Sequence, residues 1–167
     1  GYHRWQDWYI SSTTMNGGIP SEVGKYTHQI KFNDLKDLRA KFQKFKFAAI
    51  MIEPLSFQLP SLKFLKELKK LCKKNNTILI FDEVCTGFRV SLGGAQKIYG
   101  IEPDLSTFGK AMGNGFPISA IVGKKKIMKN FDKIFYSGTF GGETLSLAAY
   151  LFLIKYLKKN NIIKKNI

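Results

Sequence analysis

Two ionisable residues, Asp82 and Lys110, each follow a segment that we expect to be a buried strand. Asp82 follows Ile78–Phe81, and Lys110 follows Leu105–Phe108 and one glycine. A lysine in a glycine-rich turn at a strand end is poised for chemistry, because a desolvated, neutral amine attacks a carbonyl carbon. A carboxylate at the edge of an apolar interior exerts a strong field. Alone, Asp82 could be a cap or an ion-pair partner and Lys110 a surface lysine; together they predict chemistry on a carbonyl compound.

The elements that must position this pair alternate between short apolar runs and amphipathic segments. We expect strands at 47–52, 77–81, 103–108 and 118–122, and helices at 33–42, 60–74, 93–99, 124–131 and 143–159. The first half of the last helix is apolar nearly all round, which predicts that it is buried. Apolar strands alternating with helices are typical of an α/β fold, with a mostly parallel sheet covered on both faces. In such sheets chemistry collects at the carboxyl ends of the strands, which here carry Glu53, Asp82, Glu83 and Lys110.

The composition bounds the class of protein. The chain has 167 residues, of which 44% are hydrophobic, enough for one domain or a large piece of one and too many for whole-chain disorder. Its longest near-apolar run, 145–154, is short of the roughly 20 residues that span a bilayer. Two cysteines and no metal-ligand pair favour a reducing, cytoplasmic location without a disulfide framework. Because the chain begins with Gly1 in an aromatic-rich stretch, we expect it to be a fragment.

The formal charge of +15 suggests an anionic partner, and nucleic acid is the first class to consider. Only Arg4, Arg39 and Arg89 are arginines among the 27 basic residues. Since arginine is the preferred side chain for bidentate recognition of bases and phosphates, a solvated lysine surface is the favoured interpretation. A basic module that binds nucleic acid or an acidic surface, without catalysis, stays as the alternative.

Four short motifs together resemble one family of enzymes. They are Ile80–Arg89 (IFDEVCTGFR), Pro103-Asp104, Phe108-Gly109-Lys110 and Gly113–Pro117 (GNGFP). Their order and spacing resemble class III pyridoxal-phosphate aminotransferases, and more narrowly the glutamate-1-semialdehyde 2,1-aminomutase branch. The resemblance runs from Tyr2 to about Tyr150. It implies that residues 1–167 form the central part of the large domain of a fold-type I enzyme. The upstream phosphate loop and the C-terminal small domain of such an enzyme would lie outside the chain.

The resemblance implies specific roles for the residues that match its motifs. Lys110 would form the Schiff base with the aldehyde of pyridoxal 5'-phosphate and later carry the proton. Asp82 would pair with the pyridine nitrogen and keep it protonated, which stabilises a carbanion on the substrate. Val84 would pack against one face of the ring. Tyr2, next to His3 in the same motif, would stack on the other face.

Two further matches concern the neighbouring subunit and the edge of the site. Thr139 corresponds to a threonine that reaches the cofactor phosphate of the other protomer, which implies a homodimer with shared sites. Glu53 matches a glutamate near the cofactor to which we assign no step. Cys85 stands where several members have a glutamine that contacts the ring hydroxyl, and where the aminomutase branch has an apolar residue.

The implied activity is amino-group transfer between a small-molecule amino donor and a carbonyl acceptor. A transaminase and a glutamate-1-semialdehyde 2,1-aminomutase share every matching residue, so both stay open. A third possibility is a fragment that keeps these residues but binds the cofactor poorly.

Overall fold

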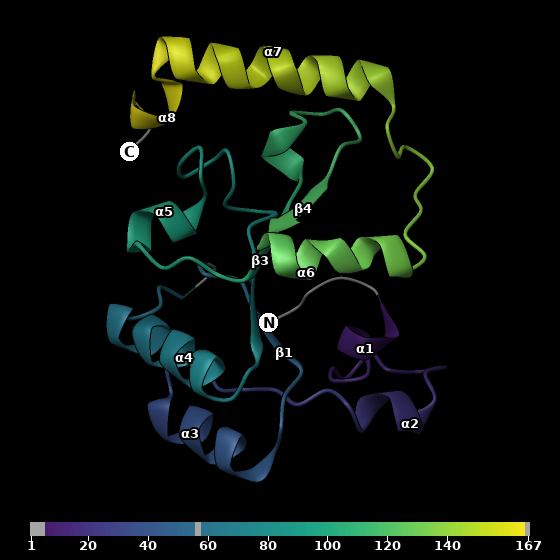
Figure 1. Cartoon of the computed structure of the whole chain (residues 1–167), viewed down its shortest axis with the longest axis vertical. Helices are drawn as coiled ribbons and strands as arrows, with labels where there is room; N and C mark the ends of the chain where they lie inside the picture. Colours follow the sequence, from purple (N-terminus) through teal and green to yellow (C-terminus); the bar gives the residue numbers. More distant parts are fainter. Residues whose placement is uncertain (1–5, 56–57, 166–167) are drawn as a thin grey trace. The chain divides into compact units, whose positions relative to one another are not determined.

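The computed structural model of the chain describes residues 6–55 and 58–165, with side chains as far as residue 163 (Figure 1). The chain divides into two compact units, Gly1–Lys46 and Phe47–Ile167. The predicted site lies almost entirely in the second unit. Tyr2 and His3, which the family resemblance also implies, lie outside the described residues.

The described residues of the first unit, 6–46, form three short helices, α1 (Asp7–Ile10), α2 (Ser21–Gly24) and α3 (Leu35–Lys44). The helix predicted at 33–42 is α3, and Asp34 caps it by accepting a hydrogen bond from the N–H of Asp37 at 2.9 Å. The rings of Trp8 and Tyr26 lie 6.0 Å apart between the segments of α1 and α2.

The second unit is built on a four-stranded sheet in the order β1 (Ala49–Ile52), β2 (Ile78–Asp82), β3 (Leu105–Phe108) and β4 (Ala120–Gly123). The first three strands are parallel, which confirms the mostly parallel sheet, and Asp82 is paired with Thr107. Strand β4 returns antiparallel to β3. The connection between them holds only the 3₁₀ turn η1 (Lys110–Met112), which is too short for the crossover that a parallel partner needs.

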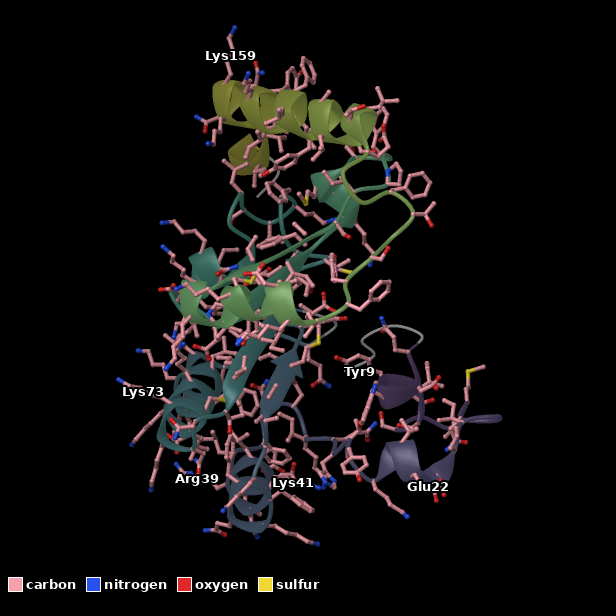
Figure 2. All side chains as sticks on the ribbon, turned by 45° about the vertical axis from the view of Figure 1, so that its right-hand side comes forward. Tyr9, Glu22, Arg39, Lys41, Lys73 and Lys159 are labelled. Carbon is pink, nitrogen blue, oxygen red and sulfur yellow. The ribbon has the colours of Figure 1, made fainter. Side chains whose placement is uncertain are left out.

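Helix α4 (Leu62–Lys74) covers the sheet and confirms the amphipathic prediction. The hydroxyl of Ser61 caps its first turn by accepting from the N–H of Phe64 at 3.1 Å. Its buried side chains form the core with those of β2: Phe64, Leu65, Leu68, Cys72, Leu79 and Phe81. The opposite face of the helix carries lysines, and Lys73 points away from the ribbon in Figure 2. Asn75 ends the helix.

Four further helices and one 3₁₀ turn complete the unit: α5 (Ala95–Tyr99), α6 (Lys125–Met128), η2 (Lys129–Lys133), α7 (Thr144–Asn160) and α8 (Ile162–Lys165). The basic helix predicted at 124–131 is therefore one α-helical turn that continues as a 3₁₀ turn. Gly100 closes α5 in the left-handed conformation. No helix in the described part of the chain is long and apolar enough to cross a membrane.

The predicted burial of the first half of α7 is wrong. Ser146 is the buried residue of this helix, whereas Leu145 is 63% exposed and Phe152 is 70% exposed. A helix that is apolar on all sides is buried only where other segments pack against each of its faces. Within residues 6–55 and 58–165 such packing is present on one side only, where Tyr150 meets the ring of Phe88.

Candidate active site

Asp82 is the last residue of β2, and its side chain is held in a nearly water-free position. The residue is 5% exposed. Its Oδ1 accepts hydrogen bonds from the N–H of Val84 at 3.1 Å and from the hydroxyl of Thr107 at 3.2 Å. Thr107 belongs to β3 and is the residue paired with Asp82 in the sheet. The two strands therefore fix this carboxylate at the carboxyl end of the sheet.

Lys110 is the first residue of η1, directly after β3 and Gly109. Its backbone has φ +44°, in the left-handed region that residues other than glycine rarely adopt. Such a conformation costs of order 1 kcal/mol and persists where its surroundings fix it, often at functional sites. Here the N–H of Met112 bonds to Gly109 and the N–H of Gly113 bonds to Lys110, at 2.9 and 3.0 Å.

The side chain of Lys110 turns toward the loop that follows β2. Its Nζ donates a hydrogen bond to Sγ of Cys85. The expectation that this lysine is shielded from water is wrong for this chain, because its side chain is exposed. It lines a cavity of about 430 Å³ together with Phe88, Arg89 and Asn114.

Asp82 and Lys110 lie at the same edge of the sheet. Because β2 and β3 are parallel and Asp82 pairs with Thr107, the residues that follow both strands emerge on the same side. The contact between Cys85 and Lys110 joins the two segments directly. The structure thus confirms the prediction that Asp82 and Lys110 stand at the carboxyl ends of two strands of a parallel sheet.

The backbone turns at Val84 and does not continue as an extended strand from Asp82. The N–H groups of Thr86 and Gly87 both bond to the carbonyl of Glu83, at 3.2 and 2.7 Å. Val84 is nevertheless buried, and its Cγ1 lies 3.5 Å from where a Cβ on Gly109 would stand. The side chain of Val84 therefore lies beside the turn that carries Lys110.

Glu83 has a structural role that the sequence left unassigned. It is fully buried, and its carboxylate accepts from the N–H groups of Ala95 and Gln96, each at 2.8 Å, and from the hydroxyl of Thr86. These bonds tie the turn after β2 to the start of α5. The sequence feature that indicates this role is Gly93-Gly94 directly before α5, because a glycine permits the close approach of a carboxylate. Thr107 was also missed, although the strand pairing brings it beside Asp82.

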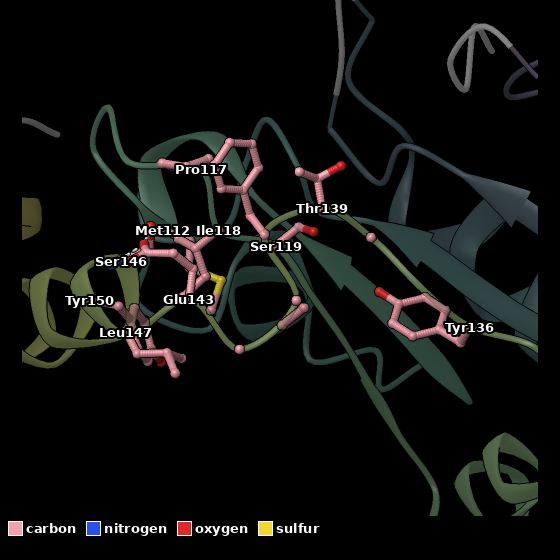
Figure 3. Close-up of a pocket in the computed structure, with 15 residues that line it drawn as sticks. Met112, Pro117, Ile118, Ser119, Tyr136, Thr139, Glu143, Ser146, Leu147 and Tyr150 are labelled. Atoms are coloured by element: carbon pink, nitrogen blue, oxygen red, sulfur yellow. Dashed lines mark hydrogen bonds between the residues drawn. The ribbon is translucent and has the colours of Figure 1, made fainter.

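Thr139 lines a second cavity, of about 670 Å³, that is separate from the Lys110 cavity (Figure 3). Ser119, Tyr136 and Glu143 also line it, whereas Asp82 and Lys110 do not. Glu143 caps α7 by accepting from the N–H groups of Leu145 at 2.6 Å and Ser146 at 2.7 Å. The hydroxyl of Ser146 and these two N–H groups lower the pKa of Glu143. The loop that carries Thr139 is thus anchored by a capped helix.

Glu53 follows β1 and is half-buried, with the fully buried Pro54 directly after it. It therefore stands after the strand that neighbours β2, at the same edge as Asp82. Among the described residues, no group of three His, Cys, Asp or Glu side chains is arranged to hold a metal ion.

The residues at this edge fit an aromatic cofactor that has an aldehyde and a ring nitrogen. An amine is available at Lys110, and a buried carboxylate is held one strand away at Asp82. Val84 supplies an apolar surface between the two segments. This arrangement is typical of α/β proteins that bind a ligand at the carboxyl ends of a parallel sheet.

The chain belongs to the class-III aminotransferase family, whose model matches residues 13–166. It is 42% identical to the glutamate-1-semialdehyde 2,1-aminomutase of Archaeoglobus fulgidus over 157 residues, which cover 90% of the chain and 38% of that enzyme. It is 40% identical to the 3-aminobutyryl-CoA aminotransferase of Cloacimonas acidaminovorans over 172 residues, covering 98% of the chain and 41% of that enzyme.

Solved structures agree with this assignment. The FumI protein of Sphingopyxis sp. MTA144, in its pyridoxal-phosphate internal aldimine form, superposes with a TM-score of 0.86 at 30% identity, over 95% of the chain and 39% of that protein. An omega-transaminase from Sphaerobacter thermophilus gives a TM-score of 0.84 at 27% identity, over 93% of the chain and 42% of that protein. The chain therefore spans about two fifths of the length of these relatives.

Proposed function

We propose that the chain is part of the cofactor-binding domain of a pyridoxal-phosphate enzyme that moves an amino group. The observation that supports this most strongly is the pair at the ends of adjacent strands, with Asp82 buried after β2 and Lys110 held after β3. Pyridoxal phosphate, when bound, supplies an electron sink for a carbanion at the substrate carbon. The family assignment over residues 13–166 supports the same activity.

Each residue of the chain has a defined task in this proposal. The amine of Lys110 would hold the aldehyde carbon of the cofactor and would move a proton at the substrate carbon. The carboxylate of Asp82 keeps a proton on the ring nitrogen, and burial strengthens its effect. Its bonds from Val84 and Thr107 orient it for this task. Val84 excludes water from one ring face. The matching roles of Tyr2 and His3 on the other face are part of the proposal.

A direct test attaches the cofactor to the lysine. The purified full-length protein is mixed with pyridoxal phosphate, reduced with borohydride and digested, and the cofactor mass is mapped by mass spectrometry. We expect the mass on the peptide that contains Lys110 and its loss in Lys110→Ala, since only a linked cofactor survives digestion. Lys97→Ala, at an exposed lysine on α5, is the matched control and should keep the label. Label spread over many lysines would contradict the proposal.

A second test concerns Asp82. Asp82→Asn keeps the shape of the side chain but removes its charge, so we expect turnover to fall by at least 100-fold while the cofactor still attaches to Lys110. Unchanged turnover with a fully labelled protein would contradict the role of Asp82. Glu53 stands near this edge, and we assign it no step.

We propose further that two copies of the chain share their sites, with Thr139 of one copy binding the phosphate at the other. A hydroxyl among glycine amides suits a phosphate, and Thr139 stands in such a loop, beside a cavity separate from that of Lys110. Mixing Thr139→Ala with Lys110→Ala should restore activity, since a mixed dimer has one intact site. At random assortment about a quarter of the sites recover. No recovery from co-refolded variants would contradict shared sites.

The product class is decided by substrate assays on the full-length protein. An aminomutase converts glutamate-1-semialdehyde with no second substrate, whereas a transaminase needs an amino donor and a carbonyl acceptor and releases a keto product. The relatives include both an aminomutase and an aminotransferase at nearly equal identity. Binding to nucleic acid that falls steeply with salt and is unaffected by Lys110→Ala would instead favour the basic-module alternative.

A further inference from the structure

Two nucleophilic side chains from separate segments meet at this edge of the sheet. The thiol of Cys85 comes from the turn after β2, and the amine of Lys110 comes from η1 after β3. Nζ of Lys110 lies within hydrogen-bonding distance of Sγ of Cys85. The two groups are therefore already in contact, without a conformational change.

Hydrogen bonds fix the backbone at both residues. The turn that carries Cys85 is closed by bonds from Thr86 and Gly87 to the carbonyl of Glu83, whose side chain is fully buried. Lys110 is held in the left-handed conformation by the hydrogen bonds of η1. Groups fixed near their reactive geometry react at high effective concentration, since little entropy is lost on approach.

The pair is also accessible to a small oxidant. Cys85 is half-buried, Lys110 is exposed, and the cavity of about 430 Å³ opens onto Lys110. The other cysteine of the chain, Cys72, lies in the core on α4. Burial, with a smaller contribution from the charge of Asp104, raises the pKa of Cys72 to about 12, so that its thiol stays protonated and unreactive near neutral pH.

We propose that Cys85 and Lys110 form a reversible covalent cross-link when the protein meets a peroxide. Hydrogen peroxide oxidises the thiol by two electrons to a sulfenic acid and is itself reduced to water. The amine of Lys110 then attacks the sulfur, an S–N bond forms, the S–O bond breaks, and a second water leaves. Two equivalents of a thiol reductant restore the free thiol and the free amine and leave as a disulfide.

The consequence for the amino-transfer activity rests on the proposed function. A lysine whose nitrogen is bonded to sulfur cannot hold the aldehyde of the cofactor. Oxidation would therefore block cofactor attachment until the S–N bond is reduced. Conversely, a cofactor already attached to Lys110 would protect the pair.

The test uses the purified, cofactor-free full-length protein, treated with hydrogen peroxide and digested with trypsin under non-reducing conditions. We expect a cross-linked pair of peptides that joins Cys85 to Lys110, lighter by about 2 Da than their sum because two hydrogens are lost. A thiol reductant should separate them. The cross-link should persist in Cys72→Ala and disappear in Cys85→Ser and in Lys110→Gln.

Other products would overturn the proposal. Cys85 found only as a sulfinic or sulfonic acid, or only in a disulfide, would show that the amine does not capture the oxidised sulfur. Binding of pyridoxal phosphate before and after oxidation is then measured by borohydride labelling of Lys110. If the cross-link forms but the reduced protein takes up no cofactor at Lys110, the proposed function fails while the cross-link stands. If the cofactor binds at Lys110 and no cross-link forms, the cross-link proposal fails while the proposed function stands.

Discussion

The two ends of strands β2 and β3 hold their carboxylates in different ways. At the carboxyl end, Glu83 is fully buried and bonded to the N–H groups of α5 and a hydroxyl. At the amino end, Asp104 is partly exposed and lies 2.5 Å from the ammonium of Lys124 and 3.9 Å from that of Lys69, while it accepts the N–H of Leu79 at 2.8 Å. The amino end therefore uses its lysines in ion pairs.

The lysine at the carboxyl end is used differently. Lys110 forms no ion pair within the described residues, and its amine faces a thiol. At the amino end, lysines form ion pairs that stabilise the sheet. At the carboxyl end, the amine of Lys110 is not paired with a carboxylate of the described residues and stays available for chemistry. Four substitutions test this contrast.

The largest effect is expected for Glu83→Ala. It leaves the N–H groups of Ala95 and Gln96 and the hydroxyl of Thr86 without their buried acceptor. We expect a loss of about 3–5 kcal/mol in the free energy of unfolding, measured by urea denaturation of the full-length protein. A loss below about 1 kcal/mol would mean that water replaces the carboxylate and that this end is not fastened by it.

The next effect concerns Gly94, the residue directly before α5, which has φ +72°. A Cβ there would lie 2.3 Å from Oε2 of Glu83, so Gly94→Ala must displace the buried carboxylate. We expect it to cost about 2–4 kcal/mol in unfolding free energy. Gly100→Ala is the matched control: it also has φ above zero, at +63°, but no atom lies within 4 Å of its Cβ position. Only the backbone cost of about 1 kcal/mol should remain there; equal losses at both positions would argue against the close approach.

Asp104→Asn tests the amino end. Burial acts to raise the pKa of Asp104, but the hydrogen bonds from Lys124 and Leu79 and the charge of Lys69 outweigh it, and the pKa is lowered overall. A carboxyl whose folded-state pKa lies below its unfolded value contributes stability above the unfolded pKa and loses it as the pH falls. We therefore expect Asp104→Asn to cost about 1 kcal/mol near pH 7, and this cost should shrink as the pH falls through the lowered pKa of the folded-state carboxyl. A difference from the unsubstituted protein that does not change with pH would show that the charge of Asp104 is unimportant.

The smallest effect is expected for Lys69→Met. Its ammonium is 3.9 Å from Asp104 and partly exposed, so the pair should contribute less than about 0.5 kcal/mol and should weaken with salt. Lys70→Met, at an exposed position one residue along α4, is the control for the added apolar side chain. Thermal unfolding at low and high salt measures both variants. A loss at Lys69 as large as that at Glu83 would remove the contrast between the two ends.

The sequence by itself determined the strands, the amphipathic helix α4 and the placement of Asp82 and Lys110 at strand ends. These depend on local patterns: apolar runs four to six residues long, lysines opposite leucines, and a glycine after a helix. The family motifs, read from the same residues, led to the family to which the chain belongs.

Only the tertiary structure decided what lies across from each residue. It brought Thr107 to Asp82, Cys85 to Lys110 and Glu83 to the start of α5, in pairs separated by 25, 25 and 12 positions in the sequence. It also left one side of α7 uncovered, although the sequence predicted burial. The physical reason is the same in each case: a local pattern states which side chains avoid water, but the partner of a side chain depends on strand pairing and on turns between distant segments.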